Sequence, residues 1–236
     1  MKNSENIKNE LNDLGIGRDI SKVQRFFKTG AGQYGEGDVF IGLTVPEIRA
    51  IAVRNFETEL EEVVNLLDSE VHEHRLCGFL ILVRKFEKTK NDNELKDIVD
   101  FYVRNIERAD NWDLVDLSAD RILGRYLAKK KDRSILYELA GSENLWRKRV
   151  SIVANWDLIK NGQLDDIYKI ALIHFDHSHD LIRKAVGWML REAGKKDKER
   201  LVQFLKFHYS RIPRTTLRYA IEKFSEQERK AFLKMS

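Results

Sequence analysis

Proline is scarce in this chain: its 236 residues include only two, Pro46 and Pro213. Because proline interrupts helices and favours turns, so few prolines predict long, uninterrupted helices. Cysteine is scarcer still, since Cys77 is the single one. One cysteine excludes a disulfide within the chain and a zinc site built from several thiolates.

Long apolar runs are also missing. No segment approaches the roughly 18 consecutive apolar residues of a membrane span, and the polar start MKNSENIKNELNDL lacks the apolar core of a secretory signal peptide. With 42% hydrophobic and 34% charged residues, the composition is typical of a folded protein and too apolar for a disordered one. We therefore expect a soluble, cytoplasmic protein that does not contact a membrane.

Similar helices recur along the chain. Four segments begin with basic residues and continue with apolar residues at helical spacing, near positions 72, 144, 180 and 212. A further helix, starting at NWDLVD, fills the longer gap between the first two, and shorter amphipathic segments lie between the others. A two-helix unit repeated about every 36 residues is typical of a HEAT-like α-solenoid. The sequence predicts an all-α fold of stacked antiparallel helix pairs, in one domain over residues 1–236.

One glycine-rich segment interrupts this pattern. Seven of the 13 glycines fall within residues 15–42. Alternating apolar residues around Gly35–Gly37 predict a short β-hairpin at residues 30–42, either purely structural or in contact with a ligand. Gly30, Gly32 and Gly35 also match the pattern G-x-G-x-x-G. A dinucleotide site needs a strand before this motif and a helix after it, whereas here a helical pattern precedes it and an extended one follows.

Charge is distributed unevenly. Residues 179–236 hold 15 Lys and Arg against 7 Asp and Glu, although the whole chain carries a net charge of only +4. A basic region of this kind favours a polyanionic partner such as nucleic acid. The alternative is a solvated basic surface without a partner.

Four side chains have the spacing and chemistry of a shared site. Trp112 and Asp116 are four residues apart near a helix start, so they share one helix face. Arg149 follows about one repeat later, and Trp188 one repeat after that. Equivalent positions of successive repeats line the same face of a solenoid, which would bring the four onto one concave patch. The alternative is two core tryptophans with ordinary surface charges.

Two sets of potential metal ligands occur. The three histidines of HFDHSHD fall between predicted helices, where regular elements give a metal site little support. Asp113, Asp116 and Asp120 lie three and four apart on one helix, a spacing equally typical of an exposed acidic stripe. We predict neither a metal nor a cofactor.

Several motifs together resemble a known family. NWDLVD, LWRKRV and IRKAVGWMLRE, in this order and at this separation, are similar to segments of the AlkD-like DNA alkylation repair family, the HEAT-like DNA glycosylases and their relatives. GLTVPEIRAIA, which contains Pro46 and Arg49, and IPRTTLRYAIEKF also resemble family segments. The resemblance extends over residues 26–232, most of the chain.

This resemblance implies hydrolysis of the N-glycosidic bond of cationic, N3- or N7-alkylated purines in double-stranded DNA, with the lesion recognised from the backbone side. The family's catalytic carboxylate falls on Asp116, its lesion-facing tryptophans on Trp112 and Trp188, and its backbone-binding arginine on Arg149. We expect a monomer whose DNA contacts come mainly from basic residues near the starts of successive helices: Arg49, Lys148, Arg149, Arg183, Lys184, Arg214 and Arg218.

Two features differ from the best-known branch of the family. That branch has a second tryptophan at the position of Asn111, and the glycine-rich segment is an addition to its plainer N-terminus. Three interpretations follow. The intact Trp, Asp and Arg set favours a DNA glycosylase. The added segment favours a non-catalytic binder of branched, distorted or damaged DNA. A protein-interaction scaffold is less compatible with the basic C-terminal region.

Overall fold

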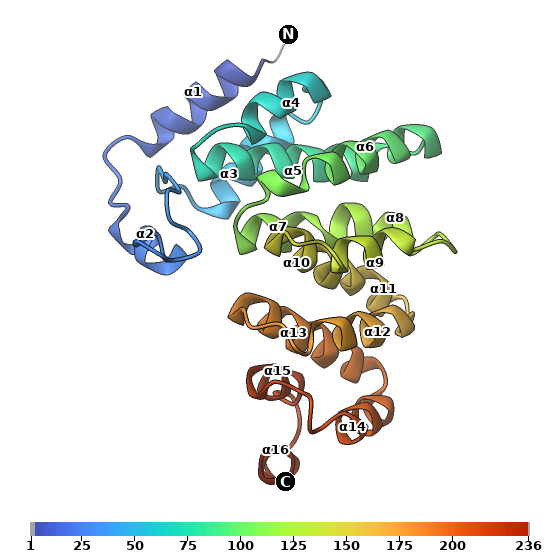
Figure 1. Cartoon of the computed structure of the whole chain (residues 1–236). Helices are drawn as coiled ribbons and strands as arrows, with labels where there is room; N and C mark the ends of the chain where they lie inside the picture. Colours follow the sequence, from blue (N-terminus) through green and yellow to red (C-terminus); the bar gives the residue numbers. More distant parts are fainter. Residues whose placement is uncertain (1–2, 236) are drawn as a thin grey trace. The chain divides into compact units, whose positions relative to one another are not determined.

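The computed structural model describes residues 3–235, and helices make up nearly all of their regular structure (Figure 1). No strand occurs in this range, so the all-α prediction is confirmed. None of the described helices is long and apolar enough to cross a membrane. The chain divides into two compact units, residues 1–118 and 119–236. The expectation of a single domain stays a prediction.

The first unit is built around one long helix. Its elements are α1 (Ser4–Gly15), α2 (Ser21–Phe27), α3 (Val45–Arg54), α4 (Leu60–Leu67), α5 (His72–Lys88), α6 (Asp92–Arg104), the short 3₁₀ helix η1 (Ile106–Arg108) and α7 (Trp112–Ser118). Helices α3, α4, α6 and α7 all pack against α5. Most of α5 is buried, including Leu76, Phe79 and Leu82. A helix that is apolar on most sides is stabilised only when neighbours cover those sides, which explains the central place of α5.

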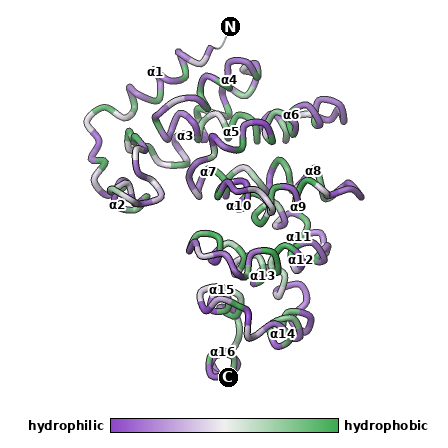
Figure 2. Tube along the Cα trace, viewed as in Figure 1, coloured by the Kyte–Doolittle hydropathy of each residue, from purple (hydrophilic) through white to green (hydrophobic). Residues whose placement is uncertain are grey.

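The second unit repeats the helix-pair pattern. Its elements are the π-helix η2 (Asp120–Gly124), α8 (Arg125–Leu127), α9 (Ser134–Ala140), α10 (Leu145–Val153), α11 (Asn155–Lys160), α12 (Asp165–His174), α13 (Asp180–Lys196), α14 (Lys198–Phe207), α15 (Arg214–Ala220) and α16 (Glu226–Lys234). The pairs α9–α10 and α12–α13 pack together, and α13 also packs against α10 and α15. Figure 2 shows apolar and polar residues mixed along individual helices, as in amphipathic helices that bury one face. The arrangement is consistent with an α-solenoid.

Helices α13 and α15 approach closely at Gly187. A Cβ atom added there would lie 2.5 Å from the Cβ of Tyr219 and 2.6 Å from the carbonyl oxygen of Thr216. Both distances are far below van der Waals contact, and one involves backbone. The two helices therefore pack at this distance only because residue 187 has no side chain.

Replacing Gly187 with alanine is expected to lower the free energy of unfolding by about 1–3 kcal/mol, because the methyl group forces α13 and α15 apart. The better helix propensity of alanine, about 1 kcal/mol, offsets part of this cost. Gly141→Ala is the control, since its nearest neighbouring atom would be 3.6 Å from the new Cβ. Urea unfolding measures both variants. A Gly187→Ala protein as stable as wild type would show that the helices do not meet there.

The predicted β-hairpin at residues 30–42 is wrong. The β-pairing in the described chain is a single parallel bridge between Val39 and Val71. The amide of Val39 donates to the carbonyl of Glu70 (3.4 Å), and the amide of His72 donates to the carbonyl of Val39 (2.8 Å). The extended residues therefore pair with the chain just before α5 and not with a second arm of their own segment.

The glycines of this segment serve packing and turns. The amide of Gly35 donates to the carbonyl of Lys28 (3.2 Å), and a Cβ on Gly35 would lie only 2.4 Å from the carbonyl oxygen of Phe27. Gly32 and Gly37 have positive φ angles of 72° and 84°, which glycine adopts without strain. The segment folds back onto the end of α2 as a series of turns.

Candidate functional site

Helix α7 carries the first two candidate residues. Trp112 and Asp116 lie one turn apart in α7, and both are half-buried. The side-chain oxygen of buried Asn111 accepts the amide of Trp112 (2.8 Å), which satisfies one of the N–H groups that a helix start leaves without a partner. Asn111 thus fixes the residue at which α7 begins.

Aromatic rings from α2 cover part of Trp112. The Phe27 ring stacks on the indole with centroids 5.4 Å apart, and Phe26 makes an edge contact at 5.6 Å. Phe27 also stacks on Phe40 at 5.0 Å, while Phe26 keeps 63% of its surface exposed. Neither phenylalanine was predicted as a site residue. The two adjacent phenylalanines could have suggested an aromatic contact. No local sequence pattern, however, identifies Trp112 as the residue that they contact.

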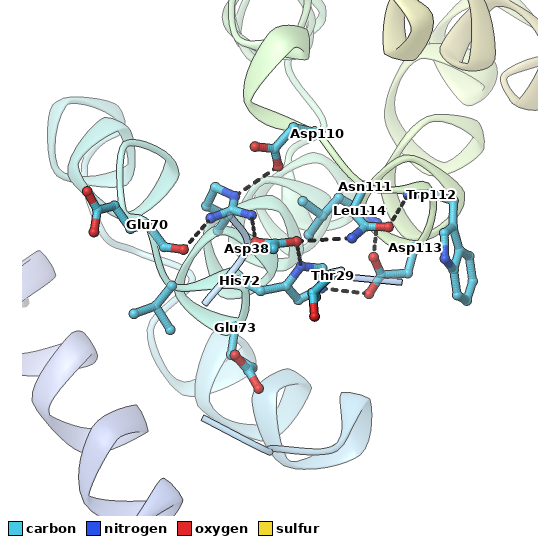
Figure 3. A network of polar contacts seen from close by, with 12 residues as sticks. Thr29, Asp38, Glu70, His72, Glu73, Asp110, Asn111, Trp112, Asp113 and Leu114 are labelled. Atoms are coloured by element: carbon cyan, nitrogen blue, oxygen red, sulfur yellow. Dashed lines mark hydrogen bonds and ion pairs between the residues drawn. The ribbon is translucent and has the colours of Figure 1, made fainter. Parts of the chain in front are cut away.

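Next to α7, a buried histidine lies between two carboxylates (Figure 3). His72 Nδ1 is 3.2 Å from an Asp38 oxygen, and Nε2 is 2.9 Å from an Asp113 oxygen. Burial lowers the pKa of His72, but the carboxylates of Asp113 and Asp38 outweigh it and raise the pKa to about 9. Burial raises the pKa of Asp38, yet its contacts with His72 and Arg75 leave it below the usual value. The cluster is therefore an imidazolium held between two carboxylates.

Asp38 joins three parts of the first unit. Besides His72, it accepts hydrogen bonds from Arg75 of α5 and from the side-chain amide of Asn111 (3.0 Å). Arg75 also donates to Asp110 (3.1 Å), the residue just before Asn111. The glycine-rich segment is thus fastened to α5 and to the start of α7. Figure 3 shows this network beside the point where the Trp112 backbone enters the helix.

In the second unit, Arg149 differs from the expected solvent-facing arginine. It is only 5% exposed, and its Nη1 donates to the carbonyl of Leu181 (2.7 Å) in the first turn of α13. Thr216 of α15 donates to the carbonyl of Arg183 (3.0 Å) in the same turn. These bonds bring the starts of α10, α13 and α15 side by side.

The predicted DNA-contacting residues of this unit lie on those three helices. Arg214 and Arg218 are exposed on α15, with Arg214 donating to the carbonyl of Leu233 (2.8 Å). On α13, Arg183 is half-buried and Lys184 pairs with Asp180, while α10 carries the half-buried Lys148. The remaining predicted residue, Arg49, is half-buried in α3 of the first unit. Within the second unit, the structure therefore places four of the predicted cations near the starts of three neighbouring helices, whereas Arg218 lies in the last turn of α15.

Trp188 of α13 has an aromatic neighbour that was not predicted. Its ring meets Trp156 of α11 edge-on, with centroids 5.3 Å apart, and the Lys160 ammonium lies 5.1 Å from the Trp156 ring. Trp188 remains half-buried. It belongs to the second unit, whereas Trp112 and Asp116 belong to the first. The convergence of all four residues on one patch stays a prediction.

The potential metal ligands have other partners. Asp113 and Asp120 are both buried, with Asp113 paired to His72 and Asp120 lying 3.5 Å from the Lys160 ammonium. They do not form an exposed acidic stripe. Over residues 3–235, no group of three or more His, Cys, Asp or Glu side chains is arranged to hold a metal ion. Of the HFDHSHD histidines, His177 and His179 accept backbone N–H groups at the start of α13, while His174 is buried.

Comparison with known proteins agrees with this fold. Residues 7–224 match the family model described as DNA alkylation repair enzyme. A solved structure, the predicted DNA alkylation repair enzyme from Enterococcus faecalis, superposes with a TM-score of 0.69 at 18% identity, covering 87% of this chain and 94% of that one. At this identity the likeness establishes the fold. The search of curated proteins gave no match. Because the family model covers most of the sequence, the chain belongs to the DNA alkylation repair enzyme family, a membership that supports a role in DNA repair.

Proposed function

We propose that the protein is a DNA glycosylase that hydrolyses the N-glycosidic bond of N3- or N7-alkylated purines in duplex DNA. The observation that carries the proposal is the pairing of Trp112 and Asp116 one turn apart on α7, in a chain of this family. The buried network at Asn111 and His72 supports it, because a preorganised helix start holds both side chains in fixed positions.

The chemistry suits these side chains. Alkylation at N3 or N7 makes the purine cationic, so the base leaves without protonation by a general acid. Cleavage of the bond develops oxocarbenium character on the deoxyribose, and the Asp116 carboxylate opposes that charge. The same carboxylate orients the attacking water. Trp112 and Trp188 present aromatic surface to the cationic nucleotide, an interaction that contributes about 1–2 kcal/mol when desolvated.

DNA contact is assigned to the exposed and half-buried cations that the sequence analysis predicted on α10, α13 and α15. Arg149 is buried and donates to the carbonyl of Leu181, so it also holds the start of α13 in place. A backbone phosphate is assigned to Arg149 as well, because the family resemblance implies that role for it. Arg149→Ala should therefore weaken binding to damaged and undamaged duplexes alike.

Duplex affinity is expected to fall steeply with salt. If six basic residues of the second unit each neutralise one phosphate, the dissociation constant should rise about 10³-fold between about 50 and 200 mM salt. Arg218→Ala should reduce the salt slope by about one. Lys169→Ala, which removes an exposed charge in the middle of α12, is the matched control. Fluorescence anisotropy with an unmodified duplex measures all three proteins. An affinity that is unchanged over this range would rule out the assignment.

The second candidate is a non-catalytic binder of branched, distorted or damaged DNA. It no longer rests on a hairpin, since none forms. Its support is the partial covering of Trp112 by Phe27 and the exposure of Phe26 beside it, because an exposed aromatic ring can enter an opened base step. Release of free base from an N7-methylguanine duplex, measured beside gel shifts on plain and branched duplexes, separates the two functions.

A further inference from the structure

The turn between α12 and α13 contains two histidines with the same hydrogen-bond pattern. His177 Nδ1 accepts the amide of His179 (3.1 Å), and His179 Nδ1 accepts the amide of Leu181 (3.2 Å). A ring nitrogen that accepts an N–H group carries no proton, so each neutral imidazole has its proton on Nε2. The N–H donor of each ring therefore lies on the edge opposite the backbone group that it caps.

These two rings and their neighbour Arg183 offer donors without acceptors. Both rings are half-buried, and their Nε2 atoms have no hydrogen-bond partner among residues 3–235. Arg183 donates through Nε to the carbonyl of His177 (2.8 Å), which leaves its Nη groups available. Buried His174, whose ring centroid is 6.2 Å from that of His177, has no partner for Nε2 either. A cluster of donors with few acceptors is suited to an oxyanion.

Cations on α10 and α13 add to this preference. Lys148 of α10 and Arg183 of α13 act on His177, and Arg149 of α10 acts on His179. Burial, followed by these cations, holds the pKa of both histidines below its usual value, although Asp180 opposes this at His179.

The two carboxylates in or beside the turn are engaged with other cations. Asp180 pairs with Lys184 (2.6 Å), and Asp176 pairs with Arg211 of the loop before α15 (2.9 Å). The local potential is therefore positive.

We propose that His177, His179 and Arg183 form a binding site for a phosphate of the DNA backbone, and that the two imidazoles take up protons when the phosphate binds. The inference rests on the proposed function, because it takes duplex DNA as the ligand. A bound phosphate offsets the surrounding cations, so protonation of the rings costs less in the complex than in the free protein. Protonation at Nδ1 disrupts the backbone caps in both states, and this cost cancels between them.

The direction of the pH dependence follows by linkage. A ring whose pKa is higher in the complex binds DNA more tightly as the pH falls, with a limit of tenfold per pH unit for each histidine. The window lies between the lowered pKa of the two rings in the free protein and their higher pKa in the complex. We expect the dissociation constant of an unmodified duplex to fall at least about fivefold from pH 8 to pH 6 at constant ionic strength, within that linkage limit.

Asparagine provides a variant that keeps the fold. Its side-chain oxygen can replace Nδ1 as the backbone cap, but it has no titrating ring and no Nε2 donor. The double variant His177→Asn/His179→Asn should bind more weakly at pH 6 and lose the pH dependence. His208→Asn, which removes a histidine of the second unit outside this turn, should keep the dependence seen in wild type.

The experiment measures the dissociation constant by anisotropy at four pH values between 5.8 and 8.2 for the three proteins, with circular dichroism to confirm folding. A wild-type protein that binds DNA equally well across this range overturns the site and leaves the proposed glycosylase intact, as does a double variant that keeps the wild-type pH dependence. A protein that binds no duplex at any pH overturns both. This assay measures binding and not base release. A protein that shows this pH-dependent binding but releases no base in a separate assay would contradict the glycosylase proposal alone.

Discussion

Replacing Asp116 with asparagine is expected to slow base release about a hundred- to thousandfold while leaving duplex affinity unchanged or improved. The carboxylate opposes a positive charge that develops mainly in the transition state, so its loss affects the chemical step more than ground-state binding. Loss of one preorganised electrostatic contact typically costs about 3–4 kcal/mol. Because the asparagine amide has nearly the same shape as the carboxylate, a change in rate reports the loss of charge and not a change in packing.

Single-turnover release and equilibrium binding should be measured on the same Asp116→Asn preparation. Asp97→Asn is the matched control, because it removes an exposed carboxylate from α6 of the same unit. Its rate should equal that of wild type. If Asp116→Asn retains full activity, Asp116 is a structural residue and the catalytic group lies elsewhere.

Replacing His72 with phenylalanine is expected to lower the free energy of unfolding at pH 7 by about 3–5 kcal/mol, the usual cost of removing one partner from a buried ion pair. The new ring can keep the stacking on Phe40, whose centroid is 4.6 Å from that of His72. The substitution removes the cation between Asp38 and Asp113, so two buried carboxylates are left without the histidine between them. The decrease in the free energy of unfolding therefore reflects the loss of charge and hydrogen bonding more than a change in packing.

This prediction has a definite pH dependence. The pKa of His72 is raised to about 9 in the folded protein, against about 6.5 in the unfolded chain. The stability that its protonation contributes is fully present below about pH 6.5. It is lost as the pH rises through 9, so the difference between wild type and His72→Phe should narrow by pH 10.

Urea unfolding at pH 7 and pH 10 makes the comparison. His74 on the same helix is the control, because burial, together with Lys8, lowers its pKa to about 4 and it is neutral at both pH values. Replacement of His74 by phenylalanine should lower the free energy of unfolding by the same amount at pH 7 and at pH 10. Equal stability of wild type and His72→Phe at pH 7 would mean that the network does not hold α7.

The helices could be predicted because their signals are local. Segments chosen for apolar spacing and basic starts became α5, α10, α13 and α15, and the shorter amphipathic segments between them became α4, α6, α12 and α14. A helix forms hydrogen bonds four residues apart, so a short window of sequence contains most of the information. The prediction of a β-hairpin in the glycine-rich segment was wrong because Val39 pairs with residues 70–72, about 30 positions away. No local pattern specifies that partner.

The candidate site was predicted only in part for the same reason. Trp112 and Asp116 share α7, as their spacing required. The network that holds α7 joins Asp38, His72 and Asn111 from three separate segments. Only Asn111 lies in a quoted family motif, NWDLVD, and that motif does not show that Asn111 bonds to Asp38. The burial of Arg149 was equally invisible, because a basic residue among other basic residues usually indicates a solvated face. Only the packing of α10 beside α13 distinguishes it.

The most direct test of the proposed function is single-turnover release of free base from a duplex containing N7-methylguanine, with wild-type protein in excess, beside a duplex containing a neutral lesion and a blank without protein. The proposal predicts release of N7-methylguanine well above the uncatalysed rate and little release of the neutral base. Tight binding of both duplexes with release no faster than the blank would contradict it and establish a non-catalytic DNA-binding protein.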